Sequence, residues 1–190
     1  MLLAPEHRRQ TEAWAIMARD GVGLDNLEYK QGDLSYCDRV FALEEQSYPA
    51  DEAATREGIE KRMKEAGRFF LLATLSNEVV GFVNGTLTAS SSLTHETMST
   101  HDPNGTLLCV HSVVVSPAHR RKGLALAMLA TYLARLRDEN AKDSEKTVKE
   151  VRLLCKENLK ALYQKAGFDL VGISSVVHGK DQWFEMKALL

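Results

Sequence analysis

A short basic segment in the middle of the chain has the residue types of a turn that binds phosphate groups. The sequence SPAHRRKGLAL over 116–126 follows an apolar run and places three cations before a glycine: Arg120, Arg121, Lys122 and Gly123. If a helix begins at Leu124, its first backbone amides have no partner inside the helix and lie at the positive end of the helix dipole. Because the glycine carries no side chain, an anion can approach this backbone closely. The segment therefore predicts a diphosphate-binding site.

The spacing of this segment, R-x-x-G-x-A, differs from the better known phosphate-binding patterns. The chain contains neither G-x-x-x-x-G-K-[ST] nor G-x-G-x-x-G, so it does not predict a P-loop or a dinucleotide-binding turn. A basic, solvated turn that only begins an ordinary helix remains an open alternative. The buried strand before the segment and the helix rich in Ala and Leu after it favour a ligand site.

The elements that would position this segment alternate between strands and helices. The pattern predicts strands at 27–30, 68–75, 78–87, 106–115 and 151–155, two more after Phe168, and helices at 33–46, 51–66, 124–137 and 158–166. A long polar loop at 88–105 and a charged connection at 138–150 separate them, and residues 7–20 form a further helix candidate. The run 106–115 is apolar on both faces, which is typical of a central strand. This order indicates an α/β or α+β fold around a mixed sheet.

Composition and charge restrict the classes of protein. The 190 residues fit one domain, which we expect at 26–190, with an N-terminal extension at 1–25. A net charge of -2 argues against a nucleic-acid partner. The sequence contains no run of about 18 apolar residues, so it predicts no membrane-spanning helix. Cys37, Cys109 and Cys155 are odd in number and widely spaced, which predicts reduced thiols, no metal site and a cytoplasmic location.

Four segments together resemble one family. R-x-x-G-x-A after a central strand is similar to the acetyl-CoA signature of the GCN5-related N-acetyltransferase (GNAT) superfamily, and ALYQKAGF over 161–168 resembles that superfamily's A-x-Y-x-x-x-G-F helix. The sequences EQSYPADEAA over 45–54 and LTHETMSTHDPNGTLLCVHSVVV over 93–115 resemble the arylalkylamine (serotonin) N-acetyltransferase family. The resemblance runs in order over residues 27–190. It implies a mixed, largely antiparallel central sheet with splayed middle strands, flanked by helices.

The resemblance also implies the cosubstrate and its site. In this family acetyl-CoA binds in the gap beside the central strand, and no metal takes part. The backbone of Val113, Val114 and Val115 would pair with the pantetheine, and residues from the basic turn into the helix would hold the pyrophosphate: Arg120, Arg121, Lys122, Gly123, Leu124, Ala125 and Leu126. Asn158 is a further candidate for a contact with CoA.

The reaction implied is direct acetyl transfer to a primary amine in a ternary complex. The amine is charged at neutral pH, so it must lose a proton before it attacks, and the departing thiolate must gain one. The resemblance assigns these roles to His111 as base and Tyr163 as acid. A hydrogen-bonded core histidine and a core tyrosine are the structural alternatives. Vertebrate members carry a second histidine where this chain has Cys109, which puts a relay of two histidines in doubt.

The predicted amine is an arylalkylamine of the serotonin or tryptamine type. We expect its pocket to include Tyr48, Pro49, Leu93, Met98, Cys109, Val110 and Leu154. An acidic pocket would favour a polyamine instead, and acetylation of a protein lysine or N-terminus is a further enzymatic alternative. Outside the enzymes, the alternative hypotheses are a non-catalytic acyl-CoA sensor and a helix-turn-helix DNA binder. The sequence does not determine the oligomeric state.

Overall fold

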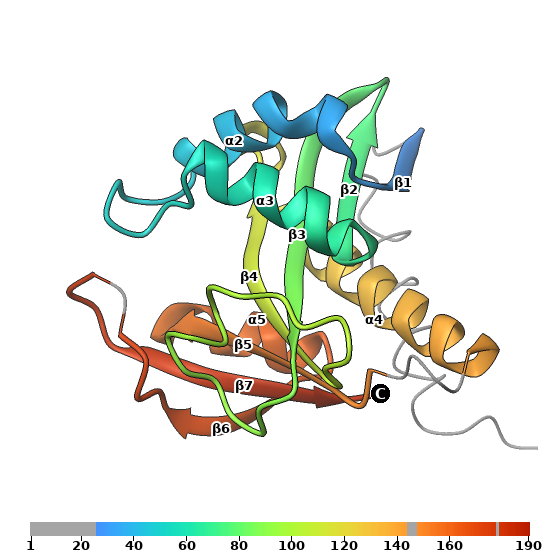
Figure 1. The fold of residues 1–190 in the computed structure, drawn as a ribbon. Coiled ribbons are helices and arrows are strands. Elements are labelled where there is room, and N and C mark those ends of the chain that lie inside the picture. Colours follow the sequence, from blue (N-terminus) through green and yellow to red (C-terminus); the bar gives the residue numbers. More distant parts are fainter. Residues whose placement is uncertain (1–25, 144–147, 178) are drawn as a thin grey trace, which may run out of the picture.

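The computed structural model describes residues 26–143, 148–177 and 179–190. Seven strands form one sheet in the order β1-β2-β3-β4-β5-β7-β6 (Figure 1). Their bounds are β1 Leu27–Gln31, β2 Phe70–Leu75, β3 Glu78–Thr88, β4 Leu107–Val115, β5 Glu150–Lys156, β6 Asp169–Ile173 and β7 Trp183–Leu189. All neighbouring strands are antiparallel except β4 and β5, which are parallel. The predicted fold class, a mixed and largely antiparallel sheet flanked by helices, is confirmed.

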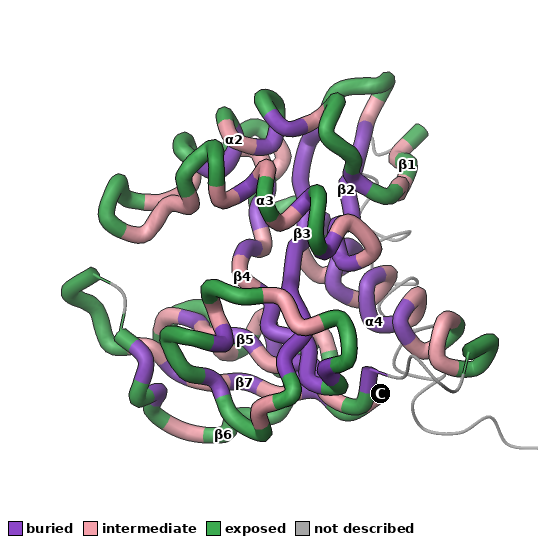
Figure 2. Tube along the Cα trace, in the orientation of Figure 1, coloured by how far each residue is buried: buried purple, intermediate pink, exposed green. Residues whose placement is uncertain are grey.

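Helices cover both faces of the sheet. Helices α2 (Cys37–Glu45) and α3 (Arg56–Ala66) pack through Val40, Ile59 and Met63 against Phe70, Phe82 and Val114. Helix α4 (Leu124–Lys142) contributes Met128, Leu129, Tyr132 and Leu136 to the larger core on the opposite face, where Tyr163 of α5 (Lys160–Lys165) also lies. Figure 2 shows the central strands as the most buried part of the molecule, whereas β6 at the edge is largely exposed.

The middle of the sheet opens between β4 and β5. The parallel pairing begins at Leu107 and Glu150 and ends at Val110 and Leu153, although both strands continue for several residues. Beyond this point the edge of β4 that faces β5 has no strand partner among the described residues. The predicted splay of the middle strands is therefore present, and it lies next to His111.

Several helix bounds differ from those predicted. The helix expected from Asp51 begins at Arg56, because Thr55 caps it by accepting a hydrogen bond from the Gly58 amide. Helix α4 runs beyond Arg137 to Lys142, since the buried face of its apolar stretch extends to Leu136 and the charged residues after it continue the helix. The helix expected from Asp33 starts as a short 3-10 turn, η1 (Leu34–Tyr36), with Asp33 as its cap. The helix expected at 158–166 likewise starts as a 3-10 turn, η5 (Glu157–Leu159).

The predictions for the N-terminal extension lie outside the described residues. Within the described ranges, no helix combines the length and the apolar composition that a membrane-spanning segment requires. The same ranges contain no group of three or more His, Cys, Asp or Glu side chains placed to hold a metal ion. The three cysteines are buried free thiols.

Candidate functional site

A cavity of about 310 Å³ lies where β4 and β5 separate. Its walls come from the end of α2 and the segment after it, from α3, from the loop 89–106, and from β4, β5, α5 and β7. The lining residues are Glu44, Tyr48, Asp51, Glu52, Ala53, Ala54, Arg62, Met98, Val110, His111, Ser112, Val113, Leu153, Leu154, Tyr163 and Trp183. Both residues predicted to transfer protons, His111 and Tyr163, therefore face the same space.

A β-bulge places His111 at this cavity. Asn84 of β3 is paired with Ser112 and the next residue, Gly85, with Val110, so His111 has no residue opposite it. The extra residue changes the phase of the side chains, and Val113 packs in the same core as Val110 rather than on the face of Cys109. The Nε2 atom of His111 lies 2.8 Å from the Thr86 hydroxyl, which fixes the direction of the ring.

Tyr163 approaches the cavity from α5. The residue is buried and its ring meets Phe168 edge-on. Burial raises the pKa of Tyr163 above its ordinary value, and the nearby Tyr48 and Cys155 act in the same direction. The phenol therefore stays protonated in neutral solution, which is the form required of an acid.

Tyr48 lies in the segment after α2, directly before Pro49, and also lines the cavity. Burial raises its pKa, and the neighbouring Glu44 raises it further, while a hydrogen bond with the backbone of Val113 opposes both effects. Tyr48 thus contacts the backbone of β4 beyond the point where the pairing of β4 with β5 ends.

Glu44 is a functional candidate that the sequence reading missed. It is only 2% exposed; its Oε1 accepts hydrogen bonds from the Ala54 amide at 3.1 Å and from the Ser112 hydroxyl at 3.0 Å. Its Oε2 is buried without a hydrogen-bond partner in the described structure. Burial raises the pKa of Glu44, although these hydrogen bonds and the charge of Arg62 act against it. The sequence feature that could have indicated this role is the spacing of four residues from Val40, which places Glu44 on the apolar face of α2.

The cavity is more acidic than the sequence predicted. Besides Glu44, the carboxylates of Asp51 and Glu52 line it, and Arg62 is the cation among the lining residues. Glu52 Oε2 is also buried without a hydrogen-bond partner in the part of the chain that the structure describes. Amines enter such a site favourably because they are cations at neutral pH.

The predicted diphosphate site lies at the far end of β4. Gly123 adopts a left-handed conformation with φ 79° and precedes α4 without a side-chain cap, so the amides of the first turn lack partners in the described structure. The adjacent Arg121 and Lys122 are exposed. Arg120 has a different role, since it donates from Nε to the Val115 carbonyl and from Nη2 to Ser47 Oγ, both at 3.0 Å.

These features fit the chemistry of CoA. Beyond Val110 the edge of β4 that faces β5 has no strand partner among the described residues and can accept an extended amide-containing chain, and the cationic helix start is suited to a pyrophosphate. The side chains of Leu124, Val114 and Val115 point into the cores, so their contribution would come from the backbone. Asn158 is exposed on η5, next to Lys156, whose ammonium is engaged in ion pairs.

Comparison with known proteins identifies the family. The model of the Acetyltransferase (GNAT) family matches residues 37–168. The chain belongs to this family. Serotonin N-acetyltransferase of Mesocricetus auratus is 30% identical over 112 residues, which cover 59% of this chain and 51% of that protein. The enzyme of Macaca mulatta is 27% identical over 59% of this chain and 52% of its own length. The matched segment thus spans about half the length of these relatives.

Solved GNAT structures agree with the fold. The loading GNATL domain of CurA from Lyngbya majuscula has a TM-score of 0.73 at 12% identity, covering 86% of this chain and 97% of that one. The GphF GNAT-like decarboxylase in complex with isobutyryl-CoA has a TM-score of 0.71 at 18% identity, covering 85% and 98%. Identities this low establish a shared GNAT fold only.

The residues predicted for the amine pocket of this GNAT domain fall into two groups. Four of them line the cavity: Tyr48, Met98, Val110 and Leu154. Leu93 and Cys109 are buried behind it, in a small cluster with Leu107 that Met98 and Leu154 cover. Pro49 is exposed and is not a lining residue.

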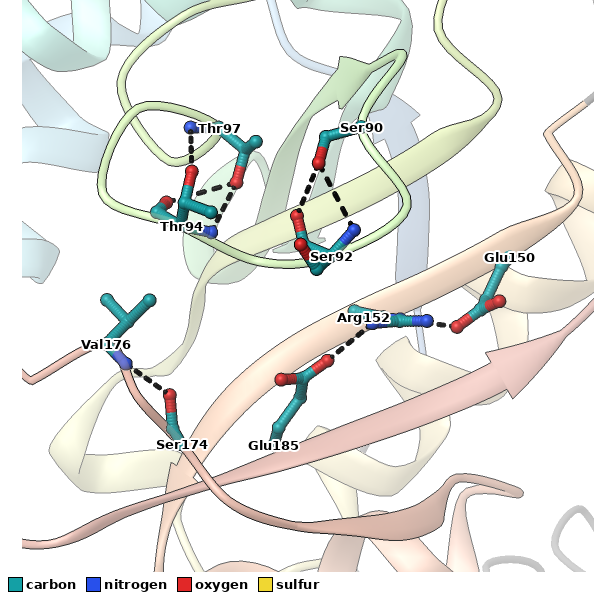
Figure 3. A network of polar contacts seen from close by, with 9 residues as sticks. All are labelled: Ser90, Ser92, Thr94, Thr97, Glu150, Arg152, Ser174, Val176 and Glu185. Atoms are coloured by element: carbon teal, nitrogen blue, oxygen red, sulfur yellow. Dashed lines mark hydrogen bonds and ion pairs between the residues drawn. The ribbon is translucent and has the colours of Figure 1, made fainter.

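The loop 89–106 forms the wall that carries Met98. Hydrogen bonds between Thr94 and Thr97 hold a tight turn, and Ser90 and Ser92 close another (Figure 3). Below this loop, Arg152 of β5 joins Glu150 to Glu185 of β7 (Figure 3). His101 anchors the loop to β3 by accepting a hydrogen bond from the Leu87 amide at 3.1 Å. These hydrogen bonds give the loop a defined conformation, and the loop forms one wall of the cavity.

Proposed function

We propose that this chain transfers the acetyl group of acetyl-CoA to the primary amine of a small arylalkylamine, in a ternary complex and without an acetylated enzyme. The observation that carries the proposal is the shared cavity of His111 and Tyr163 at the point where β4 leaves β5. The two serotonin N-acetyltransferases similar to this chain support an arylalkylamine as acceptor.

In this proposal the cosubstrate supplies a thioester, and the chain supplies position and proton transfer. The backbone of Val113 to Val115 would hold the pantetheine as an added strand. The first amides of α4, with Arg121 and Lys122, would hold the pyrophosphate. The amine would enter from the side of Tyr48, Met98 and Leu154.

Proton removal from the amine is the first task of the protein. His111, oriented by Thr86, would accept this proton directly or through water. Glu44 is a second acceptor in reach of the same cavity, and its raised pKa brings it closer to the range useful for a base at neutral pH. Glu44 would thereby fill the proton-transfer role that Cys109 leaves open. Tyr163 would donate a proton to the departing thiolate.

A polyamine is the second candidate acceptor. The carboxylates of Glu44, Asp51 and Glu52 in the cavity favour it, because each added ammonium gains a negatively charged partner. The reading as a non-catalytic acyl-CoA sensor has no such support, since a binder of CoA alone has no use for an acidic pocket beside His111 and Tyr163.

The test is turnover of acetyl-CoA, followed by thiol release, with tryptamine, serotonin, phenylethylamine, spermidine and a lysine peptide. Saturable release with an aromatic amine, lost in His111→Ala, is the expected result. Turnover with spermidine alone would move the proposal to the polyamine class. Binding of acetyl-CoA without turnover of any amine would contradict it.

A further inference from the structure

Glu52 has two carboxylate oxygens in different situations. Its side chain is 6% exposed, and Oε1 lies 2.8 Å from the Lys156 ammonium. Oε2 is buried without a hydrogen-bond partner in the described structure, and the residue lines the cavity. A buried carboxylate oxygen without a donor is costly, so a ligand that brings one gains binding free energy.

Lys156 holds Glu52 in this position. The same ammonium lies 2.8 Å from Asp181 Oδ2, on the segment before β7, and stands 5.3 Å from the centre of the Trp183 ring. One cation thus joins the segment after α2, the end of β5 and the segment before β7. Because two carboxylates share one ammonium, the trio of Glu52, Asp181 and Lys156 keeps a formal charge of -1.

Gly179, before β7, lies near Glu52. A Cβ atom added at Gly179 would lie 3.1 Å from Glu52 Oε1 and 3.2 Å from Asp51 Oδ2, so the chain passes close to both acids. Arg62 lines the same cavity, but the carboxylate on which its charge acts is Glu44. The two oxygens without a hydrogen-bond partner in the described structure, on Glu44 and Glu52, therefore belong to carboxylates that are held by different residues.

We infer that Glu52, positioned by Lys156, is a specificity-determining residue that selects amines carrying a hydrogen-bond donor at the end away from the reacting nitrogen. The inference rests on the proposed function, because it takes the cavity as the amine site. Glu44 faces the reacting amine, and Glu52 receives the distal donor. That donor is a hydroxyl group on an aromatic ring or a second ammonium, and both offer the same N–H or O–H to Glu52 Oε2.

The experiment compares kcat/KM for matched amines that differ only at the distal end. Serotonin against tryptamine and tyramine against phenylethylamine test the hydroxyl. Cadaverine against pentylamine tests the second ammonium. In the wild-type chain we expect a preference of about tenfold or more for the donor in at least one of these two arms, which is the discrimination of one hydrogen bond to a charged group.

Two variants test the residue, and one serves as control. In Glu52→Gln an amide replaces the carboxylate, so the preference for a second ammonium should disappear, whereas a phenolic oxygen can still accept from the amide and keeps part of its preference. Lys156→Met should raise KM for donor-bearing amines and leave kcat and the KM for acetyl-CoA unchanged, a split that general loss of structure would not give. Glu57→Gln changes an exposed acid on α3 and should behave as the wild type.

The outcomes separate the inference from the proposed function. Turnover of the amines with equal kcat/KM inside each pair, or an unchanged preference in Glu52→Gln, overturns the inference and leaves the function intact. If no amine is turned over, the proposed function fails. Calorimetric binding of the same pairs then decides the inference, since a donor preference lost in Glu52→Gln supports it and equal binding overturns it.

Discussion

Glu44 Oε1 and the Ser112 hydroxyl lie 3.0 Å apart, and this contact joins the end of α2 to the strand residue that follows His111. The pair keeps a buried carboxylate beside the proposed base. We expect Glu44→Gln to lower kcat/KM for the amine by about 10²-fold, because the amide retains the accepted hydrogen bonds but takes up no proton. Steady-state kinetics measure this loss. Glu45→Gln, which changes the exposed neighbouring acid, serves as control, and equal losses of kcat/KM in the two variants would contradict the role of Glu44 as a base.

The same substitution should change stability in a pH-dependent way. Burial raises the pKa of Glu44 in the folded chain, so the stability associated with its proton is present below the ordinary glutamate pKa and is lost as the pH rises through the folded value. Glu44→Gln removes this loss. We expect its Tm to exceed that of the wild type in mildly alkaline buffer and the difference to shrink in acid. Thermal unfolding at several pH values tests it, and a Tm difference that grows toward low pH would contradict the sign.

Tyr163 and Tyr132 form a matched pair of buried tyrosines with different expected roles. The Tyr132 hydroxyl donates to the Phe69 carbonyl at 2.9 Å, on the far side of the sheet from Glu44. Tyr163→Phe should lower kcat by about 10²-fold or more with little change in Tm, since it removes a proton donor. Tyr132→Phe should cost about 1–3 kcal/mol of stability, because the carbonyl loses its partner, and should leave kcat unchanged. The reverse assignment of kcat and Tm effects would refute the role of Tyr163.

Cys109 should contribute to packing rather than to proton transfer. It is fully buried between Leu93 and Leu107, and burial raises the pKa of its thiol to about 12. We therefore expect Cys109→Ala to keep kcat/KM within about twofold while costing about 1–2 kcal/mol of stability. The native thiol should resist alkylation until the chain unfolds. A kcat/KM loss without a stability loss would show that the thiol takes part in the reaction.

Substitutions at the start of α4 should change only the affinity for acetyl-CoA. Arg121→Ala and Lys122→Ala remove exposed cations beside the free amides, so KM for acetyl-CoA should rise several-fold, and the wild-type KM should rise with salt. kcat should not change. Lys142→Ala, an exposed cation at the other end of the same helix, is the control. An equal effect of all three substitutions would argue against a local diphosphate site.

Much of the fold could be predicted because its signals are local in the sequence. The apolar run ending at Val115, the turn at Gly123 and the helix rich in Ala and Leu after it each specify one element by periodicity or by turn chemistry. The helix bounds were less accurate, since the cap at Thr55 depends on a side-chain bond that competes with the equally plausible start at Asp51.

The acidic half of the cavity could not be predicted in the same way. Glu44, Glu52 and Lys156 are more than a hundred residues apart at the extremes, and only the fold brings the last two within 2.8 Å. Charged residues near helix ends are usually solvated, so their burial had no local sign except the spacing of Glu44 from Val40. The bulge at His111 also escaped prediction, because it arises from the pairing of β4 with β3.

The most direct test of acetyl transfer to an amine measures thiol release and acetylated amine together in one reaction. Purified chain is incubated with acetyl-CoA and the best amine from the panel, and the amine product and the protein are examined by mass spectrometry. Direct transfer in this cavity predicts one acetylated amine for each thiol released, an unacetylated protein, and loss of both signals in His111→Ala and Tyr163→Phe. Thiol release without acetylated amine, or acetyl groups accumulating on the protein, would contradict direct transfer in this cavity.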